Sequence, residues 1–79
     1  ELELASREVA QTVHKAIDAL APELRTAIIL REMEGLSYEE IAQAMDCPIG
    51  TVRSRIFRAR EAISEKVRPL LTHQTGKRW

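Results

Sequence analysis

Apolar residues recur every three or four positions through most of this chain, and strict alternation of apolar and polar residues is absent. No glycine-rich linker, repeat or low-complexity tract interrupts residues 5–68. A spacing of three and four places side chains on one face of an α-helix, whereas strands alternate with a period of two. We therefore expect an all-α fold. With 79 residues, 44% of them apolar, the chain is expected to form one small domain.

Start and stop signals divide the chain into four predicted helices. The first spans about residues 6–20, after a linker remnant at residues 1–5. The second spans residues 22–34 and starts with a proline, which suits the first turn because its missing N–H would have no partner there. Gly35 follows at the position where a helix end favours left-handed backbone.

The third predicted helix has the clearest start signal. In LSYEEI, Ser37 can accept a hydrogen bond from the backbone of Glu40, whose side chain can reach back to form a capping box. Leu36 and Ile41 occupy the positions of a hydrophobic staple. This helix is short and is expected to end by Met45.

A tight turn at Asp46 leads into the fourth predicted helix, which spans about residues 48–68 and is expected to stop before Pro69. Residues 72–79 are expected to form a disordered tail with an exposed Trp79. A short capped helix, a turn and a longer helix make a helix-turn-helix. Residues 6–71 are thus predicted to form a small four-helix domain with a long C-terminal recognition helix.

Charge is segregated along the chain although the formal net charge is zero. Residues 1–46 hold four basic and ten acidic residues, whereas residues 47–79 hold eight basic and two acidic ones. A basic half built on a periodic helix indicates a polyanionic partner. A basic face that is merely solvated is the alternative.

The fourth helix turns the chain's single phenylalanine away from its apolar stripe. At about 100° per residue, Val52, Ile56 and Ile63 share one face, and Phe57 points about 130° away from it. Arginine suits guanine and an aromatic ring suits a thymine methyl, so this outward face is predicted to meet DNA bases. The alternative is a ring folded back onto the core. The predicted outward residues are Gly50, Thr51, Arg53, Ser54, Phe57 and Arg58.

The flanks of the same helix suggest contacts to the DNA backbone. Arg55 and Arg60 can reach phosphates, or can pair with Glu61 and Glu65 on their own helix. Gly50 and Thr51 are also predicted to lie against the DNA backbone, and because Gly50 has no side chain, the backbone there can approach DNA closely.

The stretch LREMEGLSYEEIAQAMDCPIGTVRSRIFRAREAI resembles region 4, the promoter-binding domain of bacterial extracytoplasmic-function sigma factors. With IDALAPELRTAIIL before it, the resemblance covers about residues 10–68. It implies that the recognition helix docks on the −35 promoter element. The base contacts that it implies are Arg53, Ser54, Phe57 and Arg58, and the implied backbone contacts include Arg31, Ser37 and Tyr38.

The resemblance also implies two protein partners, the flap of the RNA polymerase β subunit and a membrane-linked anti-sigma factor, in the bacterial cytoplasm. The second helix is apolar nearly all round, so it is either a central core helix or offers one side to a partner. We place the predicted partner groove around Ile17, Leu20, Leu24 and Ile63. No apolar run approaches the roughly 18 residues that cross a bilayer, so no membrane insertion is expected.

Other functions remain as alternatives. The output domain of a response or quorum-sensing regulator has a similar helix arrangement, and a module that only binds proteins is a third hypothesis. No enzyme, cofactor, metal or small-molecule substrate is expected. Adjacent Glu39 and Glu40 point in different directions on a helix, and Cys47 is far in sequence from His14 and His73.

Overall fold

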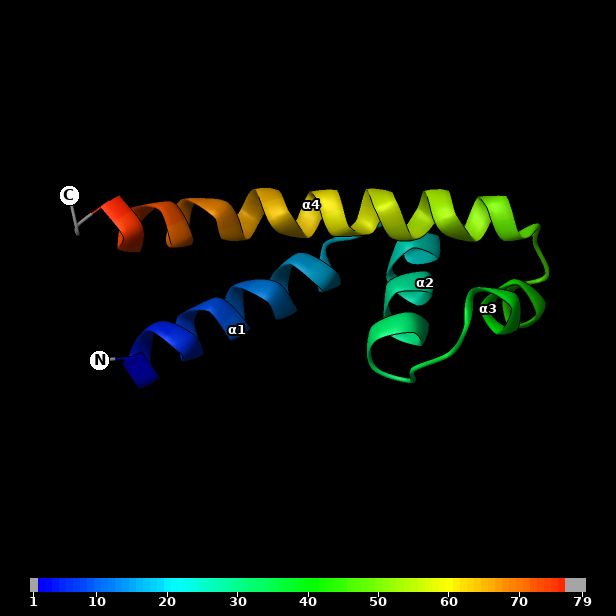
Figure 1. Ribbon diagram of the computed structural model, residues 1–79, viewed down its shortest axis with the longest axis horizontal. Helices are drawn as coiled ribbons and strands as arrows, with labels where there is room; N and C mark the ends of the chain where they lie inside the picture. Colours follow the sequence, from blue (N-terminus) through cyan, green and yellow to red (C-terminus); the bar gives the residue numbers. More distant parts are fainter. Residues whose placement is uncertain (1, 77–79) are drawn as a thin grey trace.

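The computed structural model describes the backbone of residues 2–76 and the side chains of residues 7–71. Within that range the chain forms four helices and no strands, which confirms the predicted all-α class. The helices are α1 (Leu2–Asp18), α2 (Pro22–Glu32), α3 (Tyr38–Met45) and α4 (Ile49–Gly76) (Figure 1).

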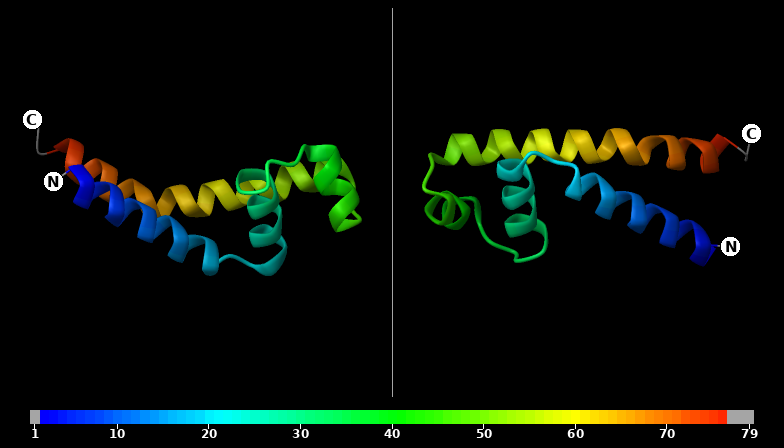
Figure 2. Two further views of the ribbon diagram at one scale, coloured as in Figure 1. Left: turned by 90° about the horizontal axis from the view of Figure 1, so that it is seen from below. Right: turned by 180° about the vertical axis from the view of Figure 1, so that it is seen from behind.

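Helix α4 extends along the length of the molecule, and the other three helices pack against one side of it (Figures 1 and 2). Helix α1 runs antiparallel to the C-terminal half of α4 and diverges from it toward the N-terminus. Helices α2 and α3 pack on the N-terminal half of α4 and on each other. Helix α4 therefore connects the part of the domain that contains α1 with the part that contains α2 and α3.

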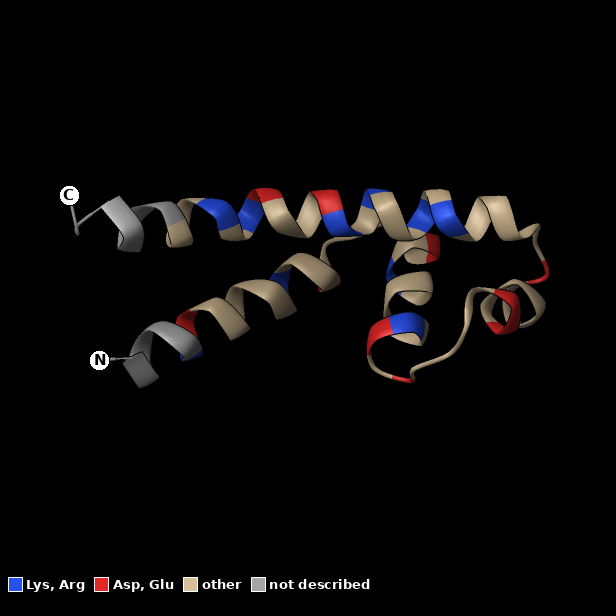
Figure 3. Cartoon of the chain, in the orientation of Figure 1, with Lys and Arg blue, Asp and Glu red and all other residues tan. Residues whose placement is uncertain are grey.

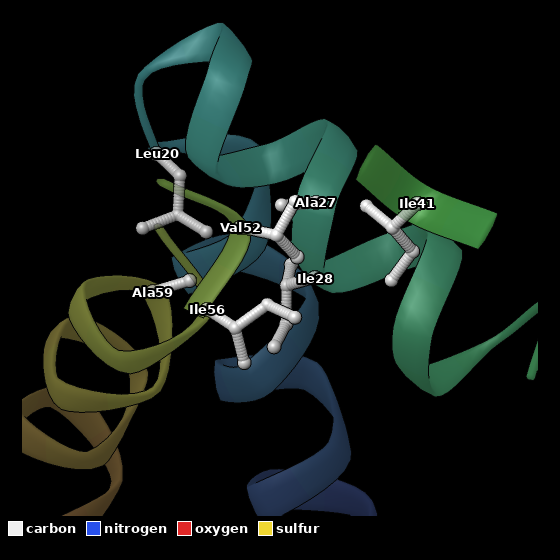
Figure 4. Packing of buried hydrophobic residues seen from close by; sticks show 7 residues of the cluster. All are labelled: Leu20, Ala27, Ile28, Ile41, Val52, Ile56 and Ala59. Carbon is white, nitrogen blue, oxygen red and sulfur yellow. The ribbon is translucent and has the colours of Figure 1, made fainter. Parts of the chain in front are cut away.

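The core lies where α2, α3 and the N-terminal half of α4 meet. Ile41, Val52 and Ile56 are the largest side chains buried completely. Burying a side chain of this size contributes about 1.5–3 kcal/mol, so these residues are central to folding. The predicted apolar stripe of α4 is confirmed at Val52 and Ile56. The buried cluster consists of Leu20, Ala27, Ile28, Ile41, Val52, Ile56 and Ala59 (Figure 4).

The predicted helix-turn-helix has the expected local geometry. The Ser37 amide donates to the Glu40 carboxylate at 2.8 Å, and the Glu40 amide donates to the Ser37 hydroxyl at 3.1 Å, which completes the capping box. Asp46 adopts the left-handed conformation with φ of 54°, and Gly35 does so with φ of 73°. Both connections of α3 are therefore set by residues suited to their backbone.

The predicted limits of the first two helices are partly wrong. Helix α1 begins at Leu2, so the expected linker is helical from its second residue onward, and α1 ends at Asp18. It ends before Leu20 because that side chain enters the core from the turn, with the Leu20 amide bonded to the Ile17 carbonyl. Helix α2 ends at Glu32, two residues earlier than predicted.

The expectation that the last helix stops before Pro69 is wrong, since α4 continues through it to Gly76. A proline inside a helix removes one backbone hydrogen bond. Here the apolar stripe runs across that point, with Val67 buried before the proline and Leu70 half-buried after it, and packing on α1 favours continued helix. The expected disordered tail is thus helical through residue 76, and Trp79 lies outside the described residues. None of the described helices combines the length and apolar character needed to cross a bilayer.

Candidate nucleic-acid interface

The outward face of α4 is exposed as the sequence predicts. Phe57 is 63% exposed, so the alternative in which its ring folds back onto the core is wrong. Arg53, Ser54 and Arg58 are exposed around it. This face results from the helical period, because burial of Val52 and its stripe turns the opposite side of α4 to solvent.

Basic residues concentrate on α4, whereas acidic residues predominate at the start of α3 and in the turns around it (Figure 3). An exposed aromatic ring within a basic face gives a surface that is both cationic and able to stack or make apolar contact. A surface with both properties is typical of a nucleic-acid interface and is unfavourable when it is exposed only to water.

A shallow groove adjoins this face where the start of α2 meets α4. Arg55 and Arg58 contribute positive charge to it, and Glu23 of α2 contributes negative charge. Arg55 is half-buried, and its Nη1 lies 3.8 Å from the Cys47 Sγ in the turn before α4. The other residues that line the groove are Ala21, Leu24, Gly50, Thr51 and Ser54.

Arg31 is engaged within the domain. Its Nη1 donates to the Leu36 carbonyl at 2.8 Å, and its guanidinium lies 5.1 Å from the centre of the Tyr38 ring. Both contacts join the last turn of α2 to the start of α3. Arg31 therefore supports the start of α3. Its contact with a DNA phosphate remains a prediction.

Arg60 pairs with a residue on another helix. Its Nη2 lies 2.6 Å from Glu32 Oε2, so the predicted pairing with Glu61 or Glu65 is wrong. The hydrogen bond that Arg60 donates to the Glu32 carboxylate raises the pKa of Arg60. Arg60 faces α2 because the end of that helix crosses its flank of α4, which the sequence of α4 alone does not reveal. Both side chains are about half exposed, so the pair adds little stability.

Comparison with known proteins identifies the domain. The family described as Sigma-70, region 4 matches residues 10–63. This chain belongs to that family. The region 4 domain is 63% identical over 68 residues to the ECF RNA polymerase sigma-E factor of Escherichia coli K12, which covers 86% of this chain and 36% of the relative. It is 59% identical over 71 residues to the factor of the same name from Haemophilus influenzae, covering 90% and 38%.

The resemblance to region 4 of an extracytoplasmic-function sigma factor is therefore confirmed. The same match is found with the ECF RNA polymerase sigma-E factor of Salmonella typhi, at 63% identity over 68 residues. The chain spans little more than a third of the length of these relatives.

The region 4 domain has a second surface, an apolar groove of about 580 Å³ formed by α1, α2 and α4. Ile17 and Ile63 line it, as predicted for the partner groove. Leu20 and Leu24 do not, because Leu20 is buried in the core and Leu24 lines the other groove, beside the outward face of α4. The apolar lining residues are Val13, Ile17, Ile28, Ile29, Met33, Ile63, Val67 and Leu71.

Sequence reasoning missed the most exposed part of this groove. Met33 is 58% exposed and Leu71 is 49% exposed. The signal was present in α2, whose apolar residues surround the helix, and in the leucines after Pro69. Recognising it required the rotation of α2 and the continuation of α4, which only the packing shows.

Proposed function

We propose that this domain recognises the −35 element of promoter DNA as region 4 of an alternative sigma factor. One observation carries the proposal: a largely exposed Phe57 is surrounded by Arg53, Ser54 and Arg58 on the long helix of a helix-turn-helix. Membership of the sigma-70 region 4 family supports it. Sigma factors are initiation factors, so no chemical step is assigned to this domain.

Base recognition would come from the N-terminal half of α4 in the major groove. The forked guanidinium of Arg53 or Arg58 can donate to O6 and N7 of guanine together. The ring of Phe57 can cover a thymine methyl and lose its own exposure to water. Ser54, between them, can donate to or accept from several base edges.

Backbone contacts would come from the start of α3 and the flank of α4. The Ser37 oxygen accepts from the Glu40 amide, but its hydroxyl hydrogen is free to donate to a phosphate. We propose the same role for Tyr38, Thr51 and Arg55. Arg60 donates to Glu32 through Nη2, and the other N–H groups of its guanidinium can donate to a phosphate.

The apolar groove is proposed as the docking site for a protein. The curated relatives are named as RNA polymerase sigma-E factors, which supports the polymerase core, through its β flap, as one partner. An anti-sigma factor is the second. A groove with an apolar floor and the Glu32–Arg60 pair in its lining suits an amphipathic helix with charged flanks. We place this activity in the bacterial cytoplasm.

A salt titration tests the DNA-binding proposal. Wild type and Phe57→Ala are bound to a promoter-like duplex carrying a GGAAC-type upstream element and to a scrambled duplex. Met33→Ala is the matched control, because it removes an exposed apolar side chain from the other groove. We expect steep salt dependence on both duplexes and a preference for the promoter that only Phe57→Ala removes.

Equal binding of wild type to both duplexes would contradict base recognition. It would favour the alternative of a module whose main partners are proteins. A regulator output domain, the other alternative, would bind a duplex with two half-sites as a dimer, which sedimentation of the complex measures.

A further inference from the structure

We propose that Gly50 is a clearance residue, whose missing side chain lets the start of α4 lie closer to promoter DNA than any other residue would allow. The inference rests on the proposed DNA recognition and adds one residue that favours DNA affinity because it has no side chain. It also predicts that the domain gives up stability at this position.

The fold itself does not need a glycine at this place. Gly35 has a φ of +73°, which side chains rarely adopt, whereas Gly50 is helical and lies outside that left-handed region. A Cβ built on Gly50 meets no atom within 4 Å. Neither backbone conformation nor packing within the domain explains why the side chain is absent.

A glycine here also makes the helix less stable. Glycine loses more backbone freedom on folding than any other residue, and replacing it by alanine at a compatible helical position stabilises a protein. A residue that opposes its own local structure, with no gain elsewhere in the fold, is typical of a functional site. The gain must then come from another molecule.

The position of Gly50 indicates that this molecule is DNA. Gly50 lies in the first turn of α4, where the Thr51 and Val52 amides both bond to the Pro48 carbonyl. It is exposed and precedes Arg53 and Ser54 by about one helical turn, on their side of the helix. It contributes nothing to the lining of the apolar groove.

A methyl group at Gly50 would act on the complex as a spacer. In a helix-turn-helix, the N-terminal part of the recognition helix lies nearest the bases. Displacing it outward lengthens the hydrogen bonds that Arg53 and Ser54 would make, and such bonds are lost beyond about 3.5 Å. A non-specific complex holds the helix farther from the base edges, so the same methyl should matter less there.

The experiment measures stability and DNA affinity of Gly50→Ala together. We expect Tm to rise by about 2–8 °C, because alanine restricts the unfolded chain. We expect the Kd for the GGAAC-type duplex to rise about tenfold, because one base contact is lost. The Kd for a scrambled duplex should change less than threefold. Ser64→Ala is the control, since Ser64 is exposed on α4 outside the DNA-facing surface.

Three outcomes would overturn the inference. The first is unchanged promoter affinity in Gly50→Ala while Phe57→Ala loses it, which refutes the clearance role and leaves DNA recognition standing. The second is a lower Tm, which means that the fold does require the glycine. The third is an equal loss of affinity in Ser64→Ala, which assigns the effect to helix stiffness. If wild type shows no promoter preference, the proposed function fails together with the inference.

Discussion

The substitution Arg31→Met removes the guanidinium and keeps an apolar side chain of similar length. It separates two roles of Arg31, the support of α3 and the predicted contact with a DNA phosphate. The substitution deletes the 2.8 Å bond to the Leu36 carbonyl and the cation over the Tyr38 ring. A hydrogen bond from a charged group contributes about 1.5–3 kcal/mol, and an exposed cation–π contact about 0.5–1 kcal/mol.

Both values are reduced by solvent because Arg31 and Tyr38 are only half-buried. We therefore expect a loss of about 1–2 kcal/mol in the free energy of unfolding, equivalent to about 5–15 °C in Tm for a domain of this size. Thermal denaturation followed by circular dichroism at 222 nm measures this. The matched control is Arg25→Met, which removes the same charge and a 3.1 Å bond to the Asp18 carbonyl at an exposed site.

DNA binding is then measured as a function of salt, well below the Tm of each variant. A lost phosphate contact reduces the slope of log K against log salt by about 0.9, whereas a lost support for α3 lowers affinity and leaves the slope unchanged. Because Arg31 is assigned both roles, we expect Arg31→Met to have a lower Tm and a slope smaller by about 0.9 than Arg25→Met. A slope smaller by about 0.9 in Arg31→Met alone, with Tm unchanged, would refute the assignment of Arg31 as a support.

Three further predictions concern the core, the cap and the base contacts. Ile56→Ala should destabilise the domain by about 2–5 kcal/mol in chemical denaturation, since the side chain is 1% exposed and leaves a cavity; a loss below 1 kcal/mol would contradict this packing. Ser37→Ala should cost about 0.5–2 kcal/mol by removing the cap, and a denaturation midpoint equal to that of wild type would argue against it. Arg58→Ala should lose about 1–3 kcal/mol of preference for the promoter duplex over a scrambled one, and an unchanged ratio would remove Arg58 from the base contacts.

Local signals predicted the helix-turn-helix well because its determinants are close in sequence. Ser37 and Glu40 are three residues apart, and their capping box depends on nothing outside the turn. The outward position of Phe57 likewise follows from the helical period, and the predicted turn is present at Asp46, a residue type that tolerates the left-handed backbone found there. These features needed no knowledge of how the helices pack.

Features that depend on residues far apart in the chain could not be predicted from local sequence patterns. Arg60 and Glu32 are separated by 28 positions, and their pairing depends on the angle at which α2 crosses α4. The helical state of Pro69 depends on packing against α1, which outweighs the local preference for a helix end. Leu24 was placed in the wrong groove for the same reason, because the rotation of α2 decides which side each apolar residue faces.

The two proposed surfaces share one continuous helix, and this restricts how partners can affect each other. Arg53 and Phe57 face outward near the start of α4, whereas Ile63 and Leu71 line the apolar groove farther along it. The buried stripe from Val52 to Ala59 holds the first part of α4 against α2 and α3, so the two surfaces have a fixed relative orientation. A protein confined to the groove therefore leaves Arg53 and Phe57 open and meets the proposed DNA contacts only at Arg60, so a partner that covers the base-facing residues must extend beyond the groove along α4.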